Sequence, residues 1–167
     1  MTAYVVCQTD NAGVYYYMDS QGEYELETPD RQAVEAALNE EYAPTDLTIT
    51  YDSTPVFSGS GETDIIYQEG AFGMPDYVLG ITWCDDAVDG STYECDQSYI
   101  RVRGAGVYSK KIACHESGHA VGLTHGTEAY PVTSNSSSIL GCMRTPIESM
   151  TTADLGSNQV SNINSVY

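Results

Sequence analysis

The chain has 167 residues and a formal charge of −18, from 24 acidic and 6 basic side chains. Such a surface repels nucleic-acid phosphates and anionic lipids, so we expect neither nucleic acid nor a membrane as a partner. No run of 18 apolar residues occurs, so no transmembrane helix is expected, and the length suits one domain over residues 1–167. The charge could attract basic substrates, although a solvated acidic surface is the plainer interpretation.

Along the first half of the chain, the pattern predicts alternating strands and helix. Short Tyr/Val runs between turn-forming residues predict short strands within the first 26 residues. A helix of about 14 residues is expected from Thr28, with threonine as its cap and Pro29 in its first turn, and Pro44 should end it. Alternating apolar residues predict a strand over 47–51, and a second strand is expected over 64–68.

The second half should carry the sheet edge and two more helices. A strand is predicted over 77–83, and Gly80 within it favours a sheet edge or a bulge. Another strand is expected over 98–103, followed by a helix that Ser109 could cap. The segment 126–141 holds too many turn formers for regular structure, and Thr151 or Thr152 should cap a last helix.

The residues from His115 to His125, HESGHAVGLTH, hold all three histidines of the chain. On a helix, residues four apart share a face, so His115 and His119 point the same way. Gly122 should end this helix, because glycine adopts the left-handed cap conformation without steric cost. The chain can then reverse and bring His125 back. Three neutral imidazoles with an open fourth position are typical of a catalytic zinc site, and Glu116 could act on its bound water.

The five cysteines favour two cross-links. Cys84 and Cys95 enclose a polar stretch that should form a closed surface loop, while Cys114 directly precedes the first histidine and Cys142 lies further along. Pairs 84–95 and 114–142 would suit an oxidising compartment and leave Cys7 over. Five reduced thiols in a cytosolic protein are the alternative.

The first ten residues lack the basic and apolar regions of a secretory signal. We expect either that a leader and any propeptide are removed before Met1, or that the chain leaves its cell by another route, such as release within a virus particle. The expected location is therefore extracellular, with a virion as the alternative.

HESGHAVGLTH matches HExxHxxGxxH, the signature of the metzincin zinc proteases, at every defined position. Metzincins also carry a methionine in a turn after the third histidine, and Met143 follows His125 by 18 residues. The chain most resembles the small matrixin-like proteases of actinobacteria and their phages, through CHESGH, LGCMRTP and the C-terminal LGSNQVSNINSVY. The resemblance covers about residues 64–167.

The resemblance implies an α+β, metzincin-like (zincin) fold. Its parts are a twisted, mostly parallel sheet with an antiparallel edge strand, a backing helix, an active-site helix, a Met-turn and a C-terminal helix. It also implies one catalytic domain over 1–167, with an N-terminal subdomain to about residue 122 and a C-terminal subdomain from about 123.

Carried over residue by residue, the family pattern implies that His115, His119 and His125 bind one Zn²⁺. Glu116 would be the general base of an endopeptidase, and Met143 would form the hydrophobic floor below the metal. A peptide or protein substrate would add itself as a strand to the sheet edge, predicted at Tyr77, Val78, Leu79, Gly80, Ile81 and Thr82.

Three departures from family patterns limit the transfer. Gly126 follows the third histidine where matrixins commonly have serine. Thr145 stands where astacins and serralysins have a tyrosine ligand, and no PRCGxPD segment indicates latency through a propeptide thiol.

Several alternatives stay open. The group Asp85, Asp86, Asp89 and Asp96 could bind Ca²⁺, but its spacing fits no EF-hand and favours an acidic surface loop. The chain could instead be a structural or adsorption protein that contacts other virion proteins and retains a zinc-bearing domain. It could also be a metal-dependent amide hydrolase acting on cell-wall material. The sequence predicts neither cleavage specificity nor oligomeric state.

Overall fold

A six-stranded sheet organises the molecule, in a computed structural model that describes residues 8–59, 61–104, 106–146 and 152–167. Strands β3, β2, β4 and β6 lie side by side in that order and run parallel. β1 pairs in parallel with the start of β6, and β5 pairs antiparallel with β6 alone. The predicted mostly parallel sheet with an antiparallel edge strand is confirmed. The strands are β1 (Gln8–Thr9), β2 (Gly13–Met18), β3 (Thr48–Tyr51), β4 (Ile65–Glu69), β5 (Gly80–Ala87) and β6 (Glu94–Val102).

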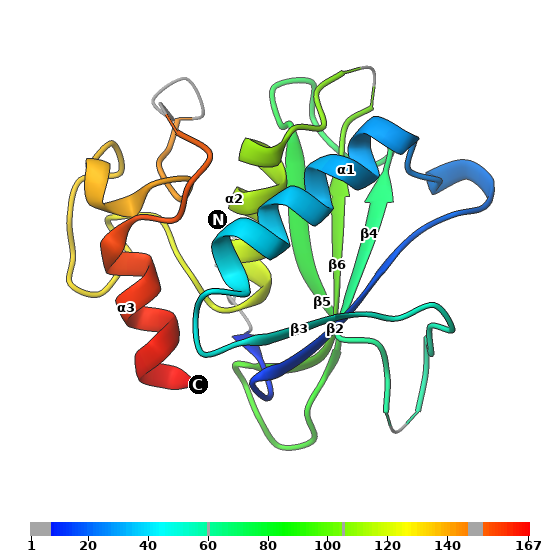
Figure 1. Ribbon diagram of the computed structural model, residues 1–167, viewed down its shortest axis with the longest axis horizontal. Helices are drawn as coiled ribbons and strands as arrows, with labels where there is room; N and C mark the ends of the chain where they lie inside the picture. Colours follow the sequence, from blue (N-terminus) through cyan, green and yellow to red (C-terminus); the bar gives the residue numbers. More distant parts are fainter. Residues whose placement is uncertain (1–7, 60, 105, 147–151) are drawn as a thin grey trace.

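Two helices cover one face of this sheet, as Figure 1 shows for α1 (Thr28–Ala37) and α2 (Lys110–Ala120). Because side chains alternate along a strand, every second residue of the central strands points into the core beneath these helices. The core residues of the strands are Val14, Tyr16 and Met18 of β2, Ile65 and Tyr67 of β4, and Ile100 and Val102 of β6. A third helix, α3 (Ser157–Val166), lies apart from the sheet beside the short helix η3 (Ser138–Leu140).

Helix α1 differs from its prediction at its start. Thr28 is its first helical residue rather than its cap, because the carbonyl of Glu27 already accepts the N–H groups of Asp30 and Arg31. Pro29 lies in the first turn, as predicted. The helix continues as a π-helical stretch, Leu38–Tyr42, and ends just before Pro44, as predicted.

The edge strand begins later than predicted. Residues 77–79 precede β5, and the side chain of Arg103 holds this segment in a turn. Its Nε donates to the carbonyl of Val78 at 2.6 Å and its Nη2 to that of Met74 at 3.0 Å. The sheet edge therefore includes Gly80, Ile81 and Thr82 of the predicted residues. It does not include Tyr77, Val78 and Leu79.

Both predicted disulfides are formed. Cys84–Cys95 joins β5 to β6, so the expected closed surface loop is a hairpin whose strands continue past the bridge. Cys114–Cys142 joins α2 to the segment that follows η3. The reduced-thiol alternative is thus wrong for these four residues. Cys7 lies outside the described residues.

Helix α3 starts at Ser157, later than a start at Thr152 would require, while Thr151 lies outside the described residues. Before the helix, Leu155 pairs with Gly141, and the N–H of Leu155 donates to Oε2 of Glu41 at 2.8 Å. In the part of the chain that the structure describes, no helix combines the length and apolar character needed to cross a membrane.

Candidate metal centre

Helix α2 ends at the predicted glycine. Gly122 has a φ of 86°, in the left-handed region that glycine favours. Its N–H donates to the carbonyl of His119 at 3.1 Å, and the N–H of Leu123 donates to that of Gly118 at 2.8 Å. These two bonds form a Schellman motif, which reverses the chain after the helix. The reversal brings His125 back to the helix.

The three predicted ligands converge. Nε2 of His115 lies 3.2 Å from Nε2 of His119 and 3.2 Å from Nε2 of His125. One nitrogen from each ring lies within 4.8 Å of the others, which is close enough for the three to bind a metal ion. Among the described residues, no other group of three or more histidine, cysteine or acidic side chains is so placed.

Backbone carbonyls orient two of these rings. Nδ1 of His115 lies 2.7 Å from the carbonyl oxygen of Cys142, and Nδ1 of His119 lies 2.9 Å from that of Leu123. Since a carbonyl only accepts, Nδ1 of each ring carries the proton, and in the neutral ring Nε2 keeps its lone pair. The rings therefore present lone pairs to their common centre, an arrangement that suits a cation.

Burial keeps the rings uncharged. It lowers the pKa of His115 to about 4 and that of His119 to about 3. Burial also lowers the pKa of His125, against the opposing charge of Glu128. Neutral imidazole is the form that binds a metal, so near neutral pH the side chains are in the ligand form.

Glu116 follows the first candidate ligand and is buried, with 6% of its surface exposed. Burial raises the pKa of its carboxyl group to about 7, against a hydrogen bond from Thr82 that lowers it. The Thr82 hydroxyl oxygen lies 2.7 Å from Oε2 of Glu116. A carboxyl group with a pKa near the working pH can both accept and return a proton.

Met143 is fully buried under the same helix. Its N–H donates to the carbonyl of Leu140 at 3.0 Å, so the methionine lies in a tight turn. A methyl group added at Gly118 would overlap the Met143 sulfur. Met143 therefore packs against α2 at Gly118, while its role as a floor below a metal stays a prediction.

A scan against known protein families and a search of curated proteins find no match for this chain. Any family assignment consequently depends on the motif and on the geometry above.

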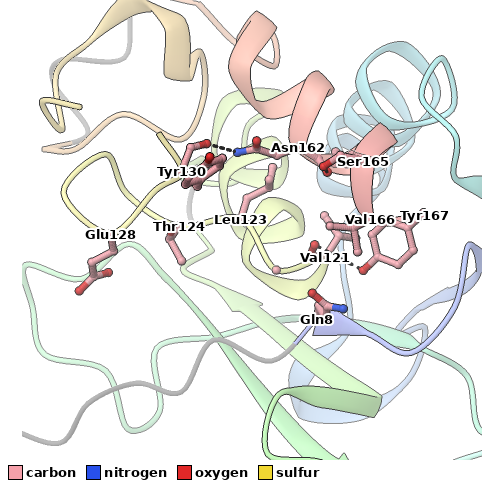
Figure 2. Close-up of a pocket in the computed structure, with 12 residues that line it drawn as sticks. Gln8, Val121, Leu123, Thr124, Glu128, Tyr130, Asn162, Ser165, Val166 and Tyr167 are labelled. Atoms are coloured by element: carbon pink, nitrogen blue, oxygen red, sulfur yellow. Dashed lines mark hydrogen bonds between the residues drawn. The ribbon is translucent and has the colours of Figure 1, made fainter. Parts of the chain in front are cut away.

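A hollow of about 290 Å³ lies between the segment 121–124 and the end of α3, as Figure 2 shows. Tyr130 lies on its wall, where its carbonyl accepts a hydrogen bond from Asn162 at 2.8 Å. None of the three histidines lines this hollow. It is therefore distinct from the space that their Nε2 atoms face.

The acidic residues of the β5–β6 hairpin are not brought together as metal ligands within the described residues. A second hollow of about 290 Å³ is lined in part by acidic side chains, namely Asp10, Asp86, Asp89 and Asp96. Among the described residues, the calcium alternative therefore has no set of ligands.

Two contributions to the site were missed from the sequence. The carbonyls of Cys142 and Leu123 orient the histidines, and a backbone group has no side-chain signature. Gly80 and Thr82 were predicted only as substrate contacts, yet both lie against Glu116. Their spacing of two along a predicted strand placed them on one face and was the available signal.

Proposed function

We propose that the chain is a zinc-dependent endopeptidase of the metzincin family, most like its matrixin-like members. The observation that carries the proposal is the convergence of three neutral histidines beside a buried glutamate. His115, His119 and His125 supply the ligands, and Glu116 stands next to the first of them.

The donor set fits zinc better than calcium. Zinc bound by imidazole at about 2.0–2.1 Å in a tetrahedron places its nitrogen ligands about 3.3 Å apart. The two Nε2–Nε2 distances of 3.2 Å in the structure agree with that spacing. Calcium takes six to eight oxygen ligands, which a group of three imidazoles does not offer.

Bound zinc would supply an acidified water and polarise the scissile carbonyl. The carboxylate of Glu116 would accept a proton at its Oε atoms and return it to the leaving amine. Burial suits this role, because it holds the pKa of the carboxyl group near 7 rather than in the usual range of a glutamate.

A peptide substrate would bind along β5. Within the described strands β5 pairs only with β6, so its outer edge carries backbone groups that an extended peptide could meet. The contact would involve Gly80, Ile81 and Thr82 rather than residues 77–79. A hydroxamate peptide should protect the amides of β5 from hydrogen exchange, and unchanged exchange there would place the substrate elsewhere.

We also propose that the chain works outside its cell. The two disulfides are typical of secreted proteins and of other oxidising locations. The bridge Cys114–Cys142 would tie the helix with two ligands to the turn that carries Met143.

The test combines metal analysis with a proteolysis assay. The wild type should bind one zinc ion per chain and cleave casein or a peptide library in a chelator-sensitive way. Glu116→Gln should keep the zinc and lose at least about 100-fold in rate, the scale of general-base catalysis. Glu23→Gln, which makes the same charge change on an exposed residue, is the matched control and should stay within about twofold of wild type.

Other outcomes would favour the alternatives. Zinc binding without cleavage of any peptide, with stoichiometric amounts of the chain in purified particles, would support a virion component. Release of cell-wall crosslinks without proteolysis would support an amide hydrolase. Failure to bind zinc would refute the metal centre itself.

A further inference from the structure

The edge strand makes a direct contact with the carboxylate of Glu116. The Thr82 hydroxyl oxygen lies 2.7 Å from Oε2 of Glu116 and 3.0 Å from its backbone carbonyl oxygen. A hydroxyl has one proton to donate, and the shorter distance assigns it to the carboxylate. This is a charge-assisted hydrogen bond from β5 to α2, between residues 34 apart in sequence.

Gly80 approaches the same carboxylate from the next position on that strand face. A Cβ atom at residue 80 would lie 2.7 Å from Oε1 of Glu116 and 2.9 Å from its Cδ. Real Cβ atoms do not come so close to other heavy atoms. The carboxylate therefore occupies space that only a glycine at this position leaves open.

The strand itself is held in place by its pairing. Gly80 pairs opposite Val102 and Thr82 opposite Ile100, both fully buried residues of β6. Residues two apart on a strand point to the same face, so the glycine gap and the threonine hydroxyl face the helix together. They form a fitted seat for one orientation of the carboxylate.

We propose that Thr82 and Gly80 position the carboxylate of Glu116 for its task. Thr82 acts as the positioning residue through its hydroxyl, and Gly80 acts by having no side chain. The catalytic consequence rests on the proposed function of Glu116 as general base, whereas the seat itself does not. A glutamate side chain has three rotatable torsions, and fixing them before substrate binds removes an entropic cost from the reaction.

The seat can be measured without any enzymatic activity. In zinc-free protein, Thr82→Val keeps the branched shape and removes the hydroxyl, so it should raise the unfolding equilibrium constant about tenfold. In a Glu116→Ala background the same change should have a clearly smaller effect, because the carboxylate acceptor is gone and only the backbone carbonyl of residue 116 remains for the hydroxyl. Thr82→Ser keeps the hydroxyl and should behave as wild type. Thr50→Val, on an exposed position of β3, is the matched control for the substitution.

The catalytic consequence is measured separately, on the zinc-loaded protein. Thr82→Val should lower kcat about tenfold with KM within about twofold and zinc content unchanged, and Thr82→Ser should restore most of kcat. Gly80→Ala should also lower kcat, because its methyl group displaces the carboxylate. A merely structural role would lower stability without this split between kcat and KM.

Three outcomes of these experiments separate the seat from the proposed function. If the effects of Thr82→Val and Glu116→Ala on the unfolding free energy are additive while the wild type cleaves peptides, the seat is overturned and the proposed function stands. A rise of kcat in Thr82→Val would overturn the inference, since the hydroxyl would then restrain the carboxylate from its task. Coupling in the zinc-free protein, together with a wild type that cleaves no peptide, would support the seat and refute the proposed function.

Discussion

Gly118 offers the sharpest test of how Met143 is packed. A methyl group added at this position overlaps the sulfur of Met143 and lies 3.0 Å from its Cε, and Met143 is fully buried. Overpacking a filled core costs about 1–3 kcal/mol, while alanine is about 1 kcal/mol more favourable than glycine inside a helix. We therefore expect Gly118→Ala to lower the free energy of unfolding by up to about 2 kcal/mol.

Met143→Ala supplies the matched background. The truncation alone should cost about 2–5 kcal/mol, because it leaves a cavity in the core. That cavity has room for the new methyl group, so Gly118→Ala should now stabilise the protein by about 1 kcal/mol through helix propensity. The hydroxyl of Tyr42 remains 3.2 Å from the added carbon and limits the gain. The two substitutions should thus be coupled by about 1–3 kcal/mol.

Urea denaturation of the zinc-free forms measures this coupling. With a slope of about 1–3 kcal/mol per molar urea, the midpoints should reveal a coupling equivalent to roughly 1 M. Circular dichroism and the fluorescence of the single tryptophan, Trp83, should report the same transition. If Gly118→Ala costs the same in both backgrounds within about 0.5 kcal/mol, Met143 does not fill the space beside α2 and the packing argument is refuted.

Three further predictions concern the disulfides, acid and the metal. Replacing Cys114 and Cys142 by alanine should weaken zinc binding about 10–100-fold in a dye competition assay, because the bridge holds the carbonyl that orients His115. Replacing Cys84 and Cys95 by alanine is the control. Loss of either bridge should lower the free energy of unfolding by about 2–4 kcal/mol, but loss of Cys84–Cys95 should leave zinc affinity unchanged. Unchanged affinity in the first pair would contradict the role of the bridge. In the zinc-free protein, the contribution of His115 to stability should be lost as pH falls from about 6.5 towards 4, because the unfolded chain binds a proton at the ordinary histidine pKa and folded His115 only near pH 4. This ring should account for about 3 kcal/mol, so urea midpoints of His115→Asn should depend less on pH, and parallel pH curves for both proteins would count against it. In protein kept with free zinc at a thousandfold its Kd, removal of the zinc by a chelator should lower Tm by about 10 °C. Added zinc should restore the original Tm. A Tm unaffected by the chelator would show that the triad holds no metal.

The helix and its two histidines could be predicted because their signals are local. The spacing of His115 and His119 places them on one face, and Gly122 marks the point where the helix must end. The disulfides were also predicted correctly, since Cys84 and Cys95 enclose a polar stretch and Cys114 directly precedes the first histidine. Alternation predicted β3, and short apolar or Tyr/Val runs predicted β2, β4, β5 and β6, although with different ends.

The remaining features depend on contacts between distant parts of the chain. The carbonyl of Cys142 lies 27 residues from His115, and no side-chain pattern announces it. The start of β5 depends on hydrogen bonds from Arg103 to carbonyls about 25 residues earlier. The cap of α1 was assigned to Thr28 by residue type, but the carbonyl that begins the helix belongs to Glu27.

One turn of α2 connects these distant contacts. His115 meets the carbonyl next to the turn of Met143, Glu116 meets β5, Ser117 bonds to Tyr67 of β4 at 2.7 Å, and Gly118 packs on the methionine. Four consecutive residues point in different directions around the helix, so each meets a different neighbour. Because the contacts are separate, their loss should have separate effects: on metal affinity at His115, on rate at Glu116, and on stability at Gly118. A protein in which these three measurements changed together would have a loosely packed helix rather than the seated one described.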